Sequence, residues 1–247
     1  MRITASGKYL GATFGSSSPS ATVQVEGGHI VAGQRLDIEA TADNVLDVTA
    51  AVPPGGDLAN LTIAFGKAES SSLAEIRPGA VIEAADARIS ARNTNDLRTH
   101  AVAAGFGEAS AAGNAATVAL GEYDSEAVAS VAGRLEIAND LTIEAHSTDQ
   151  RNETRAQASV LDPVGSHPLV QELNALLAVI PDEATLGTDL AKLIGEQVGK
   201  SGLGASVVVT SENVASARLD EGAVVRVGDD LTLEAQAEEN FQTSANS

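Results

Sequence analysis

Four histidines are the side chains best suited to acid–base or metal chemistry near neutral pH, and their spacing argues against such a site. They are His29, His100, His146 and His167, and no two of them are close in the sequence. Within the repeat described below, His29 and His146 occupy unrelated positions. Because metal sites and general acid–base sites need several groups that converge, the histidines predict neither.

Carboxylates are more numerous, and some of them recur at matching positions. Glu39, Glu144 and Glu234 are equivalent in the repeat, and Ser90 interrupts their row. Neighbouring strands of a stack lie about 4.8 Å apart, but we expect equivalent units to be two turns apart, at about 10 Å, which is too far to share a cation. Together with Asp37, these side chains predict a solvated acidic face rather than an ion site.

Sequence motifs of known chemistry are also missing. The chain has no HExxH, GxSxG or Walker-type pattern. The glycine pairs Gly27-Gly28 and Gly55-Gly56 lack the Lys-Ser/Thr that follows a phosphate loop, and the calcium-binding nonapeptide repeat is absent. We therefore predict no catalytic, cofactor-binding or metal-binding residues, no cofactor and no enzymatic activity.

The elements that carry these side chains come from a short stretch that recurs four times. In each copy apolar and polar residues alternate, which is typical of a strand with one buried face. The copies are Leu36–Ala40, Ala87–Ala91, Leu141–Ala145 and Leu231–Ala235. A second apolar residue stands six positions before each copy, namely Ile30, Val81, Leu135 and Val225. A chain that repeats one strand pair in this way is built by stacking.

The spacing of the copies gives the size of the unit. Ile38 and Ile89 are 51 residues apart (89 − 38), and Ile89 and Ile143 are 54 apart (143 − 89). A unit of this length predicts four or five short strands in two turns of about 25 residues, and about eight turns in all. Small residues between the two apolar positions predict structural corners: Gly33, Ala84, Ala138 and Gly228.

Residues 161–202 interrupt the repeat with apolar residues at helical spacing. Leu169, Leu173 and Leu177 lie on one face of a helix, and Pro181 ends it. A second pattern follows, so the segment predicts an α-helical hairpin, packed on itself and on the stack or presented to a partner. The domain organisation predicted is a β-solenoid over 1–160 (repeats near 8–58, 59–112 and 113–160), the hairpin over 161–202, and a β-solenoid continuation over 203–247.

Composition narrows the classes of partner. The net charge of −19 disfavours binding to nucleic acid and to anionic membranes. Aromatic residues make up only 2% of the chain, which suits a narrow stacked core filled by aliphatic side chains. No apolar run reaches the length of a membrane span, and no signal peptide is visible. If the protein is exported, we expect this chain to be a fragment of a longer one.

The segment from Gly204 to Ala235 resembles the repeats of large bacterial exoproteins. It reads as an Ala/Val strand, then Gly-Ala-Val-Val, then Leu-Thr-Leu-Glu-Ala, and it is similar to filamentous-haemagglutinin-like and leukotoxin-like adhesins. The resemblance covers the chain except 161–202. It implies an all-β, right-handed parallel β-helix, an extracellular or bacterial cell-surface location, and a role in adhesion or surface assembly.

The sequence thus favours a structural or adhesive segment of a cell-surface or secreted repeat protein. Its expected partners are neighbouring repeats of the same long chain, end-to-end copies, or a receptor or glycan on a host cell or another cell surface. Two alternatives remain open. One is a carbohydrate-active β-helix enzyme, such as a polysaccharide lyase or hydrolase, and the other is a self-assembling filament subunit whose open ends template stacking.

Overall fold

The structure is a computed structural model that describes residues 1–6, 10–52, 60–103, 115–158 and 205–246. These residues confirm an all-β protein with parallel sheets. The helical hairpin predicted over 161–202 lies outside the described residues. The strands are β1 (Arg2–Ser6), β2 (Leu10–Ser17), β3 (Ser20–Val25), β4 (Gly28–Val52), β5 (Asn60–Ile76), β6 (Ala80–Ala103), β7 (Ala115–Val131), β8 (Arg134–Ile137), β9 (Leu141–Ala158), β10 (Ala205–Leu219), β11 (Val224–Val227) and β12 (Leu231–Asn246).

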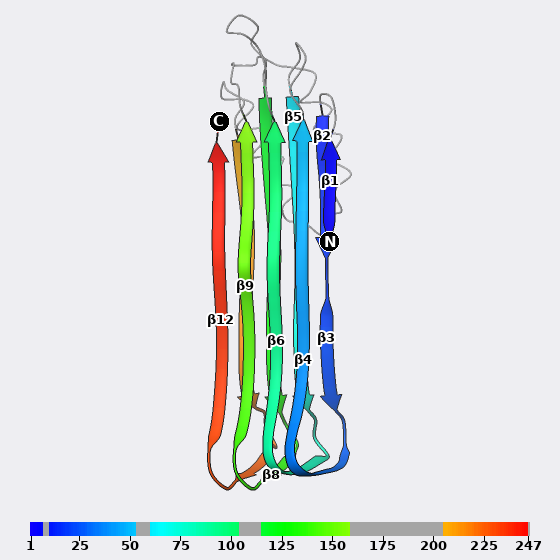
Figure 1. Ribbon diagram of the computed structural model, residues 1–247, viewed down its shortest axis with the longest axis vertical. Helices are drawn as coiled ribbons and strands as arrows, with labels where there is room; N and C mark the ends of the chain where they lie inside the picture. The colour runs from blue at the N-terminus through cyan, green and yellow to red at the C-terminus, as the bar shows by residue number, and fades with distance from the viewer. Residues whose placement is uncertain (7–9, 53–59, 104–114, 159–204, 247) are drawn as a thin grey trace, which may run out of the picture.

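The strands form two parallel sheets that face each other (Figure 1). Sheet A runs from β1 through β4, β6 and the β8/β9 pair to β11 and β12, and sheet B runs from β2 and β3 through β5 and β7 to β10. We call one passage through sheet B and then sheet A a rung. The described residues form four rungs: β2–β4, β5–β6, β7–β9 and β10–β12. β1 adds a short strand to the outer edge of β4.

Each rung is one long arch, so the prediction of two short turns per repeat is wrong. β5 has 17 residues and β6 has 24, which together use almost the whole repeat. Equivalent residues are therefore direct neighbours, one strand spacing apart rather than two. The long axis of the molecule follows the strands, at about 80 Å for 24 residues, and the stack of rungs runs across it (Figure 1). The expected eight turns and their elongated rod are not formed by the described residues.

The register confirms that the recurring segments stack in parallel. Ile38 pairs with Ile89, Ile89 with Ile143, and Ile143 with Leu233. The prediction that Val81 is equivalent to Ile30 is wrong, because Ile30 pairs with Ile82. The reason is a register shift between Ala32 and Arg35, where β4 carries one more residue than β6. Such a bulge moves every earlier residue by one position and exchanges the buried and exposed faces.

Glycine marks the ends of the arches where sheet B passes into sheet A. Gly28, Gly79 and Gly222 have φ angles of 93°, 90° and 89°, a backbone conformation that other residues rarely adopt. The predicted corner residues Gly33 and Ala84 lie inside β4 and β6 instead, next to the bulge, whereas Ala138 and Gly228 lie between two strands of sheet A.

Side chains from both sheets fill the interior in two apolar clusters. The cluster near the arches contains aliphatic residues such as Ile76, Ile82 and Ile143. The cluster toward the other end contains Leu46, Leu97 and Tyr123. The fully buried Tyr123 hydroxyl lies 2.7 Å from Thr99 Oγ1. The two clusters are separated by polar residues, which the composition did not predict.

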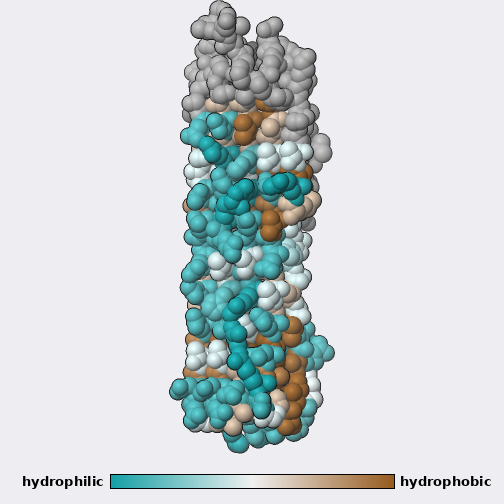
Figure 2. Space-filling view, viewed as in Figure 1, coloured by the Kyte–Doolittle hydropathy of each residue, from teal (hydrophilic) through white to brown (hydrophobic). Residues whose placement is uncertain are grey.

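The outer face of sheet A is mostly hydrophilic (Figure 2). Hydrophobic atoms gather at one edge of the lower half, where β3 and the start of β4 form the first rung (Figures 1 and 2). Val23, Val25 and Ile30 belong to this edge and are only partly buried. The stack therefore has a polar outer face on sheet A and an apolar edge at its first rung.

Candidate functional site

A belt of polar side chains crosses the interior between the two apolar clusters. One row in sheet A joins Asn44, Asn95 and Asp149 on neighbouring strands and continues to Glu239 on β12. Asn44, Asn95 and Asp149 are buried. We call these four residues, with the facing serines Ser70 and Ser125, the polar belt. Buried polar groups are costly unless they are hydrogen-bonded, so the belt needs internal partners.

Asn95 is the centre of the hydrogen-bond network in the belt. Its Oδ1 accepts a hydrogen bond of 2.7 Å from Ser70 Oγ. Its Nδ2 donates to Ser125 Oγ at 2.8 Å and to Asp149 Oδ1 at 2.7 Å. Ser125 Oγ also donates to Asp149 Oδ1, at 3.1 Å. Both sheets and two rungs are thus connected through one amide.

Asp149 is 1% exposed, and among the described residues its carboxyl group has hydrogen-bond donors but no cationic partner. Its Oδ2 is buried and makes no hydrogen bond. Burial raises the pKa of Asp149, and hydrogen bonds from Asn95 and Ser125 only partly oppose this. The charge of Glu239 on the next strand raises it further. The belt therefore disfavours the charged form of Asp149 more than water does.

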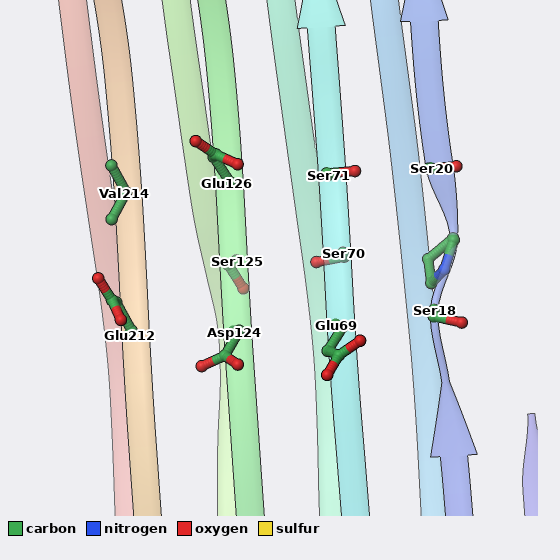
Figure 3. A pocket seen from close by; sticks show the side chains of 11 residues that line it. Ser18, Ser20, Glu69, Ser70, Ser71, Asp124, Ser125, Glu126, Glu212 and Val214 are labelled. Carbon is green, nitrogen blue, oxygen red and sulfur yellow. The ribbon is translucent and has the colours of Figure 1, made fainter. Parts of the chain in front are cut away.

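A second set of carboxylates forms a row on the outer face of sheet B. Glu69 on β5 pairs with Asp124 on β7, and Asp124 pairs with Glu212 on β10. We call these three residues the acid ladder. Figure 3 shows the three side chains next to one another on neighbouring strands. They line an open pocket of about 510 Å³.

The acid ladder is only partly neutralised. Carboxylate oxygens of Glu69, Glu122 and Asp124 lie within 4.8 Å of one another. Lys67 Nζ lies 2.8 Å from Glu69 and 3.2 Å from Glu122, and these acidic neighbours raise the pKa of Lys67. Partial burial raises the pKa of Asp124, and Glu122, Glu69 and Glu212 raise it further. Oxygen ligands of this kind suit hard cations, but Lys67 already supplies one positive charge.

The acid ladder was not predicted, because equivalent residues were expected to lie two turns apart. The signal was present in the spacing. Lys67 and Glu122 are 55 residues apart (122 − 67), as are Glu69 and Asp124 (124 − 69). A one-rung repeat places both pairs on adjacent strands.

The predicted acidic face of sheet A exists, but Glu144 departs from it. Glu39, Ser90, Glu144 and Glu234 form one row on adjacent strands. Glu39 and Glu234 are exposed, as expected. Glu144 is only 8% exposed, because side chains of the neighbouring rung cover it. It is therefore not solvated, and the prediction is wrong for this residue.

Arginines from β6 hold Glu144. Arg88 and Arg92 donate to Glu144 Oε1, the second at 3.1 Å, and Ser90 Oγ donates at 3.0 Å. Burial alone would raise the pKa of Glu144, but these three hydrogen bonds lower it to about 2. The arrangement is a neutralised ion cluster that fastens β6 to β9.

The histidines do not come together in the described residues. His29 lies 2.9 Å from Glu83, and His100 lies 3.3 Å from Glu153. His146 lies 4.0 Å from Glu144. His167 is outside the described residues. Each of the three contacts is a pair on the outer face of sheet A.

Comparison of the sequence with protein-family models gives no match, and comparisons with curated proteins and with solved structures give none either. Within the described residues, no helix is long and apolar enough to cross a membrane.

Proposed function

We propose that this chain is a non-catalytic structural and adhesive segment of a large bacterial surface or secreted protein. In this proposal the chain coils as a right-handed parallel β-helix through sheets A and B. The observation that carries it is the parallel pairing of equivalent residues along four long rungs, interrupted only at local bulges. It agrees with the resemblance of the repeats to exoprotein adhesins.

Long parallel ladders suit a structural role. β4 and β6 are paired from Gly28–Ala80 to Val52–Ala103, interrupted only by the bulge. Each rung is therefore held by many hydrogen bonds and by rows of aliphatic residues, which together resist local opening. Outward carboxylates such as Glu144, Glu153 and Asp96 are engaged by arginine or histidine rather than facing a cleft.

The acid ladder is the surface we assign to adhesion. Asp124 and Glu212 carry no ion pair in the described residues, and Glu126 stands beside them in the same open pocket. A concentrated row of negative charge favours a partner with a basic surface.

Attachment by a displayed chain tests the proposal. The full chain is anchored on a non-adherent laboratory bacterium, and attachment to epithelial monolayers is counted at matched display levels. The triple variant Asp124→Asn, Glu126→Gln, Glu212→Gln should lose most of the attachment. The triple variant Asp37→Asn, Glu39→Gln, Glu234→Gln makes the same change in net charge on sheet A and should keep it.

Two results would contradict the proposal. One is attachment no higher than that of the anchor alone. The other is release of reducing ends or unsaturated products from pectin, alginate or hyaluronan by the purified chain, which would favour the polysaccharide-active enzyme instead.

A further inference from the structure

Within the described part of the chain, the rung β10–β12 leaves its inward residues uncovered. Leu231 and Leu233 on β12 are each 43% exposed, whereas their equivalents Leu141 and Ile143 on β9 are 0% exposed. Phe241 is also exposed. These residues belong to rows that are buried in the two middle rungs, so the open edge of β10–β12 is a template for one more rung.

The first rung has a matching open edge. Ile30 and Leu36 on β4 and Val23 on β3 face the interior and are only partly buried. Hydrophobic atoms show on this edge in Figure 2. The belt is also incomplete here, because the buried Asn44 Nδ2 has no hydrogen-bond partner.

The rows of the stack fix how the two edges would meet. Leu231 ends the row that begins at Leu36, Leu233 ends the row of Ile38, and Glu239 ends the row of Asn44. We propose that β10–β12 of one copy stack in parallel on β3 and β4 of a second copy, with Leu233 beside Ile38 and Glu239 beside Asn44. In this register Glu239 offers an acceptor to the unpaired Asn44 Nδ2. This inference concerns the ends of the stack and does not depend on adhesion.

β1 limits the length of the new pairing. It covers Asp47–Ala51 of β4, so the incoming strand pairs freely only up to its Glu239. Beyond that point, residues 242–246 of β12 and β1 of the second copy compete for the same edge. Removal of residues 1–6 should therefore strengthen the association.

Because carboxylates meet at the proposed contact, the association of two copies should depend on pH. In the proposed register Glu234 meets Glu39, and Glu238 meets Asp43, on the outer face. Glu239 points inward, where its Oε1 accepts a hydrogen bond of 3.3 Å from Asn152 Nδ2 and its charge acts on Asp149 of β9. The other polar neighbours at this position, Ser211 and Asn213 of β10 and the second copy's Asn44, are neutral. Stacking would enclose the Glu239 carboxylate beside Asp149, and uptake of one proton at the interface would relieve the repulsion between the two groups. The association constant should rise as the pH falls, by up to about tenfold per pH unit for one proton taken up.

Cross-linking in register tests the geometry, since the chain contains no cysteine. Thr41 and Gln236 lie in the same outward row, three strand spacings apart within one copy but adjacent between stacked copies. A Thr41→Cys, Gln236→Cys variant of the full chain should form intermolecular disulfides with copper phenanthroline, seen as a reducible ladder on gels. The ladder should be stronger at pH 5.0 than at pH 7.5. A Thr41→Cys, Thr232→Cys variant, displaced by about 13 Å along the strand, should not form it.

Further substitutions in the cross-linking variant test the pH dependence and the apolar contact between the two copies. Glu239→Gln should produce the ladder at pH 7.5, whereas Glu126→Gln, the same charge change away from both ends, should not. Leu233→Lys should abolish the ladder at both pH values. Because pH 5.0 lies above the isoelectric point of about 4.4, isoelectric precipitation does not interfere.

Three outcomes would overturn the inference. They are equal cross-linking by the two cysteine pairs, equal behaviour of Glu239→Gln and Glu126→Gln at pH 7.5, and weaker association after removal of residues 1–6.

Discussion

Strand β9 carries two buried carboxyl groups, one on the outer face of sheet A and one in the polar belt, and their pKa values are shifted in opposite directions. Glu144 is 8% exposed and Asp149 is 1% exposed. The pKa of Glu144 is lowered to about 2, whereas the pKa of Asp149 is raised. The partners differ: Glu144 meets two arginines of β6, and Asp149 meets an amide and a hydroxyl.

The comparison shows that burial alone does not decide the charge of a carboxyl group. Desolvation disfavours the ion at both positions, and only cationic donors reverse that effect. In a stack of parallel strands those donors come from the adjacent rung, one repeat away in the sequence. Three substitutions measure how the polar belt and the ion cluster at Glu144 each contribute to stability.

Asn95→Ala should have the largest effect because it removes the amide that joins both sheets. Ser70 and Asp149 would lose hydrogen bonds in a buried site, and a cavity would remain. We expect the free energy of unfolding to fall by about 3 kcal/mol, measured by urea denaturation with circular dichroism. Thr94→Ala, the outward neighbour, should change it by less than about 0.5 kcal/mol; equal losses would mean that the belt adds no stability.

Glu144→Gln should destabilise the protein by about 2 kcal/mol at pH 7, because the arginines lose their charged partner. The lowered pKa fixes the sign: the stabilisation by Glu144 is complete above its ordinary pKa of 4.5 and is lost as the pH falls toward about 2. The difference between variant and wild type should therefore shrink in acid. Glu39→Gln, in the same row but exposed, is the control, and a similar loss in both would contradict the ion cluster.

Asp149→Asn should have the smallest effect and the opposite sign. Its raised pKa means that the native state favours the neutral form, so the wild type loses stability as the pH rises above the ordinary value of 3.8. An amide of the same shape removes that cost, so the variant should be more stable than the wild type at pH 7, by less than the loss expected for Glu144→Gln. Thermal unfolding at pH 4 and pH 7 measures the change, and a less stable variant at pH 7 would show that the ionised form is needed.

The stacking of rows was predictable, whereas the size of a rung was not. Alternation in Leu141–Ala145 and its copies identified the buried face and the equivalent residues, which the register confirms. A repeat length by itself is equally consistent with one long coil or two short ones, because both bury the same alternating pattern. The predicted partner of Ile30 was wrong by one residue, Val81 instead of Ile82, because β4 contains a bulge. A bulge has no reliable signal in a single sequence.

Both the polar belt and the acid ladder can be predicted from the sequence if the length of a rung is known. Alternation continues from Ala91 through Asn93 and Asn95, so both asparagines fall on the buried face. A spacing of one repeat then places Asp149 beside Asn95 and Asp124 beside Glu69.

The sequence by itself determined the alternation, the parallel rows and the negative charge, because these depend on residue type and spacing along one strand. Only the tertiary structure decided which carboxylates are neutralised, which are buried without a cation, and which rows end at an open edge. The physical reason is that the partners of each side chain come from the next rung and the facing sheet, about one repeat or half a repeat away along the chain.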